Sequence, residues 1–221
     1  MHDVTLTTRE TLCELLKRAT DADHGSAEKV SPMTRLMSED VELTDFADVL
    51  KRLALFHGAL EPQICMTTPQ TRLVQRVARV PLLRADLRAL GIRNEGDPAG
   101  AGGRLDLSNP SFRAGALYVV EGSALGGKVI GAHLRRRFGT PVAGSLSYYG
   151  LYGSDVARTW RDVKNEINAS GADPDRAVEG AKRAFRLFER AMQCRMPVAS
   201  RRRNRSDRSA RRIDRQQLRP A

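Results

Sequence analysis

Three glycines fall within six residues, Gly122-Ser123-Ala124-Leu125-Gly126-Gly127, inside a long apolar segment that spans residues 112–138. Apolar residues recur at helical spacing on both sides, so the segment is predicted to be a helix interrupted by glycine. Three helical glycines cost about 3 kcal/mol relative to alanine, a large share of a domain's net stability. A face without side chains lets the backbone approach a neighbour closely. That neighbour is either a packed helix or a flat ligand, and these residues alone favour neither.

The rest of the chain also shows helical periodicity, with no convincing strand. Aromatic residues make up only 5% of the chain, which suits a helical core better than a sheet. We therefore expect an all-α, multi-helical single domain over residues 1–194. Its first helix is expected to begin at a capping box, Thr7 to Glu10, and to reach about Glu28. Further helices are expected over residues 45–62, over 70–90 with an interruption or kink at Pro81, over 112–138, over 154–169 and after Pro174.

The net charge of +11 is concentrated at the C-terminal end. Ten arginines and two aspartates among residues 195–221 account for +8 of it, which leaves an ordinary +3 for the rest of the chain. Such a tail cannot build a core, so we expect it to be disordered. Nucleic-acid binding through the tail is the alternative. It would be salt-dependent and independent of base sequence, and we do not expect it to be the function.

Cysteine use and hydropathy indicate where the protein acts. Cys13, Cys65 and Cys194 are widely spaced and form no C-x-x-C pair, which fits a reducing compartment and no zinc site. We find no signal peptide and no apolar run of the roughly 20 residues needed to span a bilayer. We therefore expect a cytoplasmic protein that does not enter a membrane.

His24 is the candidate metal ligand. Leu16, Thr20, His24 and Glu28 follow one another at i+4 steps and would share one helix face. A neutral imidazole can bind iron through one nitrogen while a neighbour such as Glu28 holds the other. The spacing alone favours the alternative, a histidine near a helix end that is satisfied by water or backbone. The other internal histidines, His57 and His133, are expected to be structural or exposed to solvent.

Two motifs resemble those of bacterial haem oxygenases. Leu16-Lys17-Arg18-Ala19-Thr20-x-x-x-His24 resembles the proximal helix of that family, and the segment from Leu117 to Ile130 resembles its distal helix. The segment from Pro81 to Gly91, and Trp160, are similar to the branch found beside bacteriophytochromes. The resemblance covers about residues 8–190, and the distal segment is its specific part.

The resemblance implies a fold and a reaction. Haem b, both substrate and cofactor, would lie between the first helix and the glycine-rich helix, with His24 as the proximal iron ligand. Gly122, Gly126 and Gly127 would bring the backbone close to the distal face of the haem. With dioxygen and electrons from a ferredoxin or a reductase, haem would be cleaved to biliverdin, carbon monoxide and ferrous iron. The enzyme would supply this biliverdin to a bacteriophytochrome.

Ser123 departs from the animal-type pattern, which has Asp at this position. The serine is usual in the phytochrome-associated branch, so the distal network would be built from Ser123, backbone carbonyls or an Arg from another helix. The departure leaves open a non-catalytic haem carrier or sensor of the same fold. A thiaminase-like hydrolase of the same superfamily would need a nucleophilic cysteine, and Cys13 lies near no evident base.

Five further residues complete the expected haem site. Thr20 shares the helix face of His24, and Tyr118 is expected to hydrogen-bond near the haem edge, with packing in the core as the alternative. The haem propionates need cations, and Lys17 is the first candidate because it lies two turns before His24. Arg183 and Arg186 are the second choice, because their helix is rich in arginine anyway.

Overall fold

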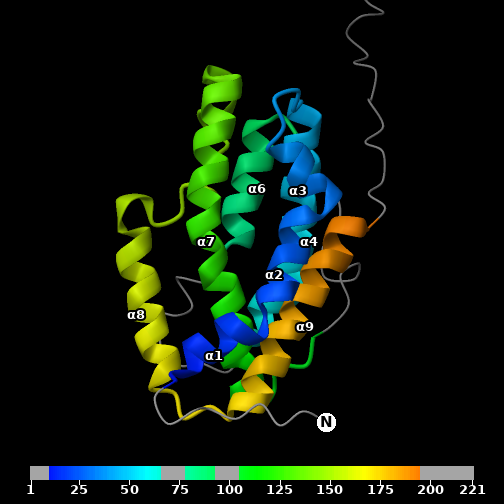
Figure 1. The fold of residues 1–221 in the computed structure, drawn as a ribbon. Coiled ribbons are helices and arrows are strands. Elements are labelled where there is room, and N and C mark those ends of the chain that lie inside the picture. The colour runs from blue at the N-terminus through cyan, green and yellow to red at the C-terminus, as the bar shows by residue number, and fades with distance from the viewer. Residues whose placement is uncertain (1–9, 66–77, 93–104, 195–221) are drawn as a thin grey trace, which may run out of the picture.

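The computed structural model describes residues 10–65, 78–92 and 105–194, and every regular element in those ranges is helical (Figure 1). The all-α prediction is thereby confirmed. None of the described helices is long and apolar enough to cross a membrane. The elements in chain order are α1 (Leu12–Ala19), α2 (Asp21–Lys29), α3 (Ser31–Leu36), α4 (Leu43–Cys65), α6 (Val80–Ala89), α7 (Pro110–Phe138), η1 (Thr140–Val142), η2 (Gly153–Asp155), α8 (Val156–Asn168) and α9 (Pro174–Gln193).

The glycine-rich segment forms one continuous helix, α7, which runs the height of the molecule between α8 and α4 (Figure 1). The Asn109 side chain caps its N-terminus by accepting from the backbone N–H of Ser111 at 2.8 Å. Gly139 ends it with a φ of 62°, a left-handed conformation that glycine adopts at little cost. The helix predicted over residues 112–138 is therefore confirmed, glycines included.

Among the described helices, α7 and α9 share the most extensive packing. A Cβ atom on Gly115 would collide with the carbonyl oxygen of Ala177, and one on Gly180 would collide with the backbone of Phe112. Neither backbone can yield as a flexible side chain would. Tight helix packing thus depends on Gly115 and Gly180, and not on the three glycines of the 122–127 stretch.

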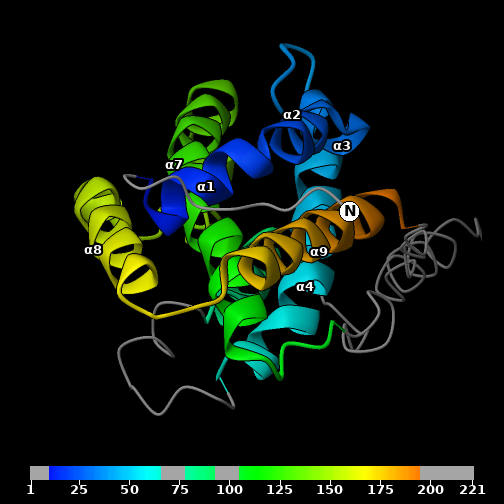
Figure 2. The same ribbon diagram turned by 60° about the horizontal axis from the view of Figure 1, so that its bottom comes forward.

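The first predicted helix is in fact two helices joined at Thr20. The capping box that the structure describes joins Thr11 to Glu14, so α1 begins at Leu12; Thr7 lies outside the described residues. The Thr20 hydroxyl donates to the carbonyl oxygen of Leu16 at 2.7 Å, and the residue adopts φ −116° and ψ 14°. Local bonds of this kind compete with the regular backbone ladder. As Figure 2 shows, α1 and α2 consequently run in different directions.

Two prolines are predicted to limit helices. Pro62 lies inside α4, which continues to Cys65 instead of ending there. Pro81 lies in the first turn of α6, where no helical N–H is needed, and residues 78 and 79 are not helical. The predicted interruption is therefore confirmed, and the alternative of a kink does not apply. Residues 70–77 of the predicted 70–90 helix, and the arginine-rich segment 195–221, lie outside the described residues.

The core has two parts. One joins α1, the C-terminal half of α4, the N-terminal half of α7, α8 and α9. The other joins α3, the N-terminal half of α4, α6 and the loop that follows α7. By contrast, α2 buries only Ala27. The helix that carries His24 therefore rests on the outside of the core.

Candidate functional site

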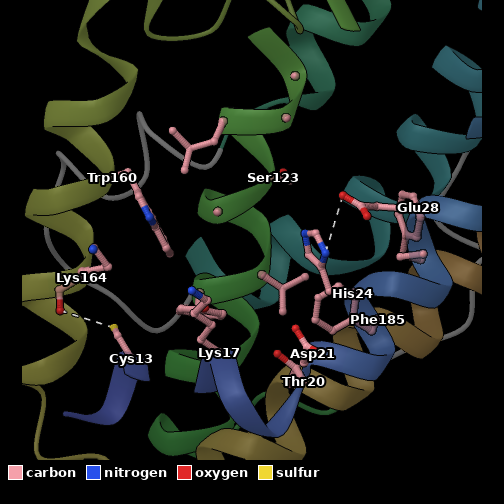
Figure 3. A pocket seen from close by; sticks show the side chains of 18 of the residues that line it. Cys13, Lys17, Thr20, Asp21, His24, Glu28, Ser123, Trp160, Lys164 and Phe185 are labelled. Carbon is pink, nitrogen blue, oxygen red and sulfur yellow. Dashed lines mark hydrogen bonds and ion pairs between the residues drawn. The ribbon is translucent and has the colours of Figure 1, made fainter. Parts of the chain in front are cut away.

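A cavity of about 990 Å³ opens between α1 and α2 on one side and α7 and α8 on the other (Figure 3). This volume is at the upper end of the range for small-molecule and cofactor sites. The sequence-predicted site residues that line it are Lys17, Thr20, His24, Tyr118, Gly122, Ser123, Gly126 and Gly127.

His24 lies in the middle of α2, on the wall opposite the glycine-rich stretch (Figure 3). Its side chain is 62% exposed, and its Nδ1 lies 3.7 Å from Oε1 of Glu28. The ring meets Phe185 of α9 edge-on, with 6.2 Å between ring centroids and an angle of 80° between planes. Because Glu28 approaches Nδ1, Nε2 is the nitrogen left for a ligand.

The three glycines of the opposite wall differ in how much space a side chain would have at each position. A Cβ on Gly126 would meet nothing within 4 Å, so this position faces open space. A Cβ on Gly122 would lie 3.4 Å from the Trp160 ring, and one on Gly127 would lie 3.5 Å from the Tyr149 ring. Both distances are ordinary van der Waals contacts, so neither aromatic ring requires a glycine at its position. Close helix packing therefore does not explain the three glycines.

Ser123 is exposed on the cavity face of α7, between these glycines. Its hydroxyl donates to the carbonyl oxygen of Val120 at 2.7 Å. Tyr148 lines the same cavity, and its hydroxyl oxygen lies 3.0 Å from Nε2 of the buried His57 on α4. Burial raises the pKa of the Tyr148 hydroxyl to about 12.

Arg79 provides a buried cation behind the same wall. Only 1% of it is exposed, and its guanidinium lies 3.2 Å from Oε1 of Glu121 and 3.3 Å from the carbonyl oxygen of Val120. Tyr152 donates to the other oxygen of Glu121 at 3.0 Å. Val120 thus accepts from both Arg79 and Ser123. An Arg from another helix is one of the predicted options for the network around Ser123; Arg79 shares the Val120 carbonyl with Ser123 but does not line the cavity, so that option stays a prediction.

Glu61 and His57 are buried one turn apart on α4. Glu61 accepts from the backbone N–H groups of Arg79 at 2.6 Å and of Val80 at 3.2 Å, which caps α6. Burial nevertheless raises the pKa of Glu61 to about 7. Burial, aided by Arg79, holds the pKa of His57 well below its usual value. His57 and His133 are both buried, so of the two predicted options the structural one applies.

Sequence reasoning missed His57, Glu61, Tyr148 and Arg79. His57 and Glu61 stand at i+4 spacing between Phe56 and Leu60. Two ionisable groups on an apolar helix face could have signalled a buried network.

Cations line the cavity on two sides. Lys17 of α1 is joined by Arg161 and Lys164 of α8, and the Lys164 ammonium lies 5.9 Å from the centre of the Trp160 ring. Arg183 and Arg186 do not reach the cavity. Both pair with Glu179, at 2.8 Å and 2.9 Å, so their expected place beside the ligand is wrong.

The remaining predicted residues are half-buried or buried. The Tyr118 ring lies 5.3 Å from Trp160, and burial raises the pKa of the Tyr118 hydroxyl to about 12. Thr20 is 2% exposed, with its hydroxyl committed to the Leu16 carbonyl. Burial raises the pKa of the Cys13 thiol to about 11, which disfavours the thiolate that a nucleophile needs.

Comparison with known proteins shows which proteins this chain is similar to. The family model for heme oxygenase matches residues 10–94. A heme oxygenase of Xanthomonas campestris pv. campestris (strain 8004) is 34% identical over 160 residues, which span 71% of this chain and 93% of that protein.

Solved structures agree on the fold. Heme oxygenase from Leptospira interrogans superposes with a TM-score of 0.66 at 15% identity, covering 83% of this chain and 98% of the other. Heme oxygenase-1 from the cyanobacterium Synechocystis, solved in complex with heme, gives 0.64 at 18% identity, with 83% and 91% covered.

Proposed function

This chain belongs to the haem oxygenase family, and we propose that its cavity holds haem between α2 and α7, with His24 on the iron. The enzyme is a haem-degrading, oxygen-dependent oxidoreductase. One observation carries the site assignment. His24 and the glycine-rich stretch line the same cavity from opposite sides, as a plate-shaped ligand with an axial base requires.

The described residues fit haem in three respects. The cavity of about 990 Å³ accommodates a drug-sized or larger ligand. An exposed imidazole with one nitrogen near Glu28 is the usual donor for haem iron. The open space at Gly126 lets a flat ring approach the α7 backbone. Bound haem supplies both the iron at which dioxygen is reduced and the ring that is cleaved.

The proximal side consists of His24, Glu28 and Phe185. Glu28 favours the tautomer of His24 with its proton on Nδ1, which leaves Nε2 as the donor to iron. The edge-on contact with Phe185 limits rotation of the imidazole. These contacts orient the ligand before haem binds.

Lys17, Arg161 and Lys164 hold the haem propionates in this proposal. All three line the cavity, and the first lies on α1 while the other two lie on α8. Carboxylates pair readily with such cations at a cavity rim. The α8 pair was not predicted from the sequence, since a Lys and an Arg on an amphipathic helix ordinarily face water.

The distal side depends on Gly122, Gly126, Gly127 and Ser123. The glycines keep side chains away from the ring, and Tyr118 packs beside Trp160 at the cavity wall. Ser123 would present a hydroxyl on this side of the cavity, where its oxygen lies 2.7 Å from the Val120 carbonyl oxygen. Its catalytic role is to order hydrogen bonds there.

We propose four further assignments. The haem is haem b, the electron donor is a ferredoxin or a reductase, and the enzyme acts in the cytoplasm. The chain belongs to the bacteriophytochrome-associated branch and supplies biliverdin to such a photoreceptor, which the Ser123 position and the Pro81 to Gly91 motif support.

Titration with hemin tests the proposal directly. We expect uptake of one hemin per chain and a six-coordinate ferric Soret band. With a reductant and air, we expect a bilin that chromatography identifies as biliverdin. Tight hemin uptake without any bilin would point to a carrier or sensor instead.

A further inference from the structure

Trp160 joins two walls of the cavity. It lies on α8, and its side chain points toward α7 (Figure 3). Three carbons of its six-membered ring lie 3.4 to 3.8 Å from the place that a Cβ atom on Gly122 would occupy. The indole therefore closes the space between α8 and α7 beside Gly122.

Neighbouring side chains hold this ring in place. Tyr118, one turn before Gly122 on α7, lies 5.3 Å from the Trp160 ring between centroids, with 56° between the ring planes. Lys164, one turn after Trp160 on α8, places its ammonium 5.9 Å from the ring centre. Trp160 and Tyr118 also pack against the core that α1, α4, α7, α8 and α9 share. A large ring packed on several sides has few other rotamers available, so it forms a rigid part of the wall.

The other end of the same α7 wall is open. A Cβ on Gly126, one turn after Gly122, would meet nothing within 4 Å. Leu125 beside it is 39% exposed, and Val129 one turn further is 62% exposed. The α7 wall is thus asymmetric, because an aromatic ring closes it at Gly122 and no side chain closes it at Gly126.

Cations gather at the closed end. Arg161 and Lys164 lie on α8 beside Trp160, and Lys17 lines the cavity from α1. The Glu14 carboxylate, which also lines the cavity, is engaged by hydrogen bonds within its capping box. Anionic groups of a ligand are therefore attracted to the end that Trp160 closes. The long stems of lysine and arginine let these cations follow an anionic group that moves, whereas the packed indole cannot follow it.

We propose that Trp160 fixes the in-plane angle of bound haem and so determines which meso carbon is cleaved. The inference rests on the proposed function. A disc held at its centre by one axial bond, here from His24, stays free to turn about that bond, and only contacts at its edge set the angle. The cations select the edge that faces α8, and the Trp160 ring stops that edge from turning further. Because the reaction opens the ring at one meso carbon, this angle selects the product.

Trp160→Leu is the central test, because it removes the ring and keeps an apolar side chain that favours the helix. We expect the wild type to form one biliverdin isomer. In Trp160→Leu a second isomer should become at least about tenfold more abundant relative to the first, since even one methylene in an apolar pocket changes discrimination by about tenfold or more. The six-coordinate Soret band should be kept, because His24 is unchanged.

Val129→Ala is the matched control. It also shortens an apolar side chain near the α7 wall, but Val129 lies at the open end and does not line the cavity. Its isomer ratio should equal that of the wild type. A shift of the same size in Val129→Ala and Trp160→Leu would assign the effect to the apolar surface in general and would overturn the role of Trp160.

A second readout needs no turnover. In proton NMR spectra of the ferric hemin complex with cyanide, the shifts of the ring methyl groups depend on the angle between the ring axes and the proximal imidazole. The wild type should show one set of methyl signals. Trp160→Leu should show a second set or a changed order of shifts, and Trp160→Phe, which keeps a smaller aromatic ring, should lie between the two.

The outcomes separate this inference from the proposed function. If the wild type binds no hemin or forms no bilin, the proposed function fails. If the wild type forms one bilin while Trp160→Leu gives the same isomer and the same methyl signals, the function stands and the role of Trp160 is refuted. A wild type that itself forms a mixture of isomers would refute it as well. Should Trp160→Leu not fold, Trp160→Phe decides by the same two readouts.

Discussion

Nδ1 of His24 lies 3.7 Å from Oε1 of Glu28, one turn further along α2. This distance is too long for a hydrogen bond, but the pair needs only a small approach to form one. A carboxylate behind a metal-binding imidazole raises its basicity and fixes its orientation. The pair therefore ties the strength of the proposed iron bond to a residue that does not touch the ligand.

Replacing the two members of this pair should have graded effects. We expect His24→Ala to lose the six-coordinate Soret band and to regain it on addition of imidazole. Glu28→Gln should keep the band but weaken hemin affinity about tenfold, since a residue that hydrogen-bonds to a metal ligand typically contributes about tenfold or more to the affinity. His133→Gln is the control, because it removes a histidine that lies outside the cavity. It shows whether losing an imidazole elsewhere in the protein changes the spectrum. An unchanged spectrum in His24→Ala would remove His24 as the ligand.

Two glycines of α7 should respond in opposite ways to alanine. Gly115→Ala places a methyl group against the Ala177 backbone and should destabilise the protein by about 1–3 kcal/mol or more. Gly126→Ala meets nothing within 4 Å and should stabilise it by up to about 1 kcal/mol, because alanine favours the helix. Urea unfolding of both variants measures the difference.

Gly126→Leu extends this comparison to ligand binding. Its side chain would enter the cavity, so hemin affinity should fall at least tenfold while the urea midpoint stays near that of the wild type. Equal hemin affinity in Gly126→Leu and the wild type would mean that the ring does not approach α7 at this point.

Reversing one charge at the cavity rim should weaken hemin binding. Lys17 lines the cavity, whereas its neighbour Arg18 pairs with Glu10 outside it. We expect Lys17→Glu to raise the dissociation constant for hemin about tenfold, which corresponds to about 1.4 kcal/mol. Arg18→Glu makes the same charge change and should leave hemin binding unaltered. Comparable weakening in both variants would indicate a general field effect and not a propionate contact.

Glu61 should make the stability of the protein depend on pH. Burial raises its pKa from 4.5 to about 7, so between these values the folded protein binds more protons than the unfolded chain. The free energy of unfolding therefore falls as pH rises from about 4.5 to 7, by an amount on the order of 3 kcal/mol. Glu61→Gln keeps the backbone acceptor and should lack this loss.

Urea titrations at several pH values check this prediction. His57 gives the opposite slope, because its lowered pKa makes unfolding easier as pH falls below about 6.5. The difference between wild type and Glu61→Gln removes that contribution. A difference that does not vary with pH would show that Glu61 titrates as an ordinary carboxyl.

Periodicity and turn residues sufficed to predict α7, α8 and α9, because each is long and has a regular apolar stripe. They did not predict the bend at Thr20, whose hydroxyl and backbone N–H both donate to the Leu16 carbonyl. Nor did they predict the buried Arg79, whose partner Glu121 is 42 residues away in sequence. Charges that pair over a long sequence separation leave no local pattern. The sequence therefore does not predict the contact between Arg79 and Glu121 behind the cavity wall.

The modest anchoring of α2 has a consequence for how this protein can be altered. Because α2 buries only Ala27, its remaining side chains carry little of the folding free energy. The surface that presents His24 is thus largely decoupled from the interior that keeps the chain folded. Substitutions along α2 offer an engineer a way to retune ligand selectivity with small losses in expression yield, whereas equivalent changes on α7 would disturb both at once.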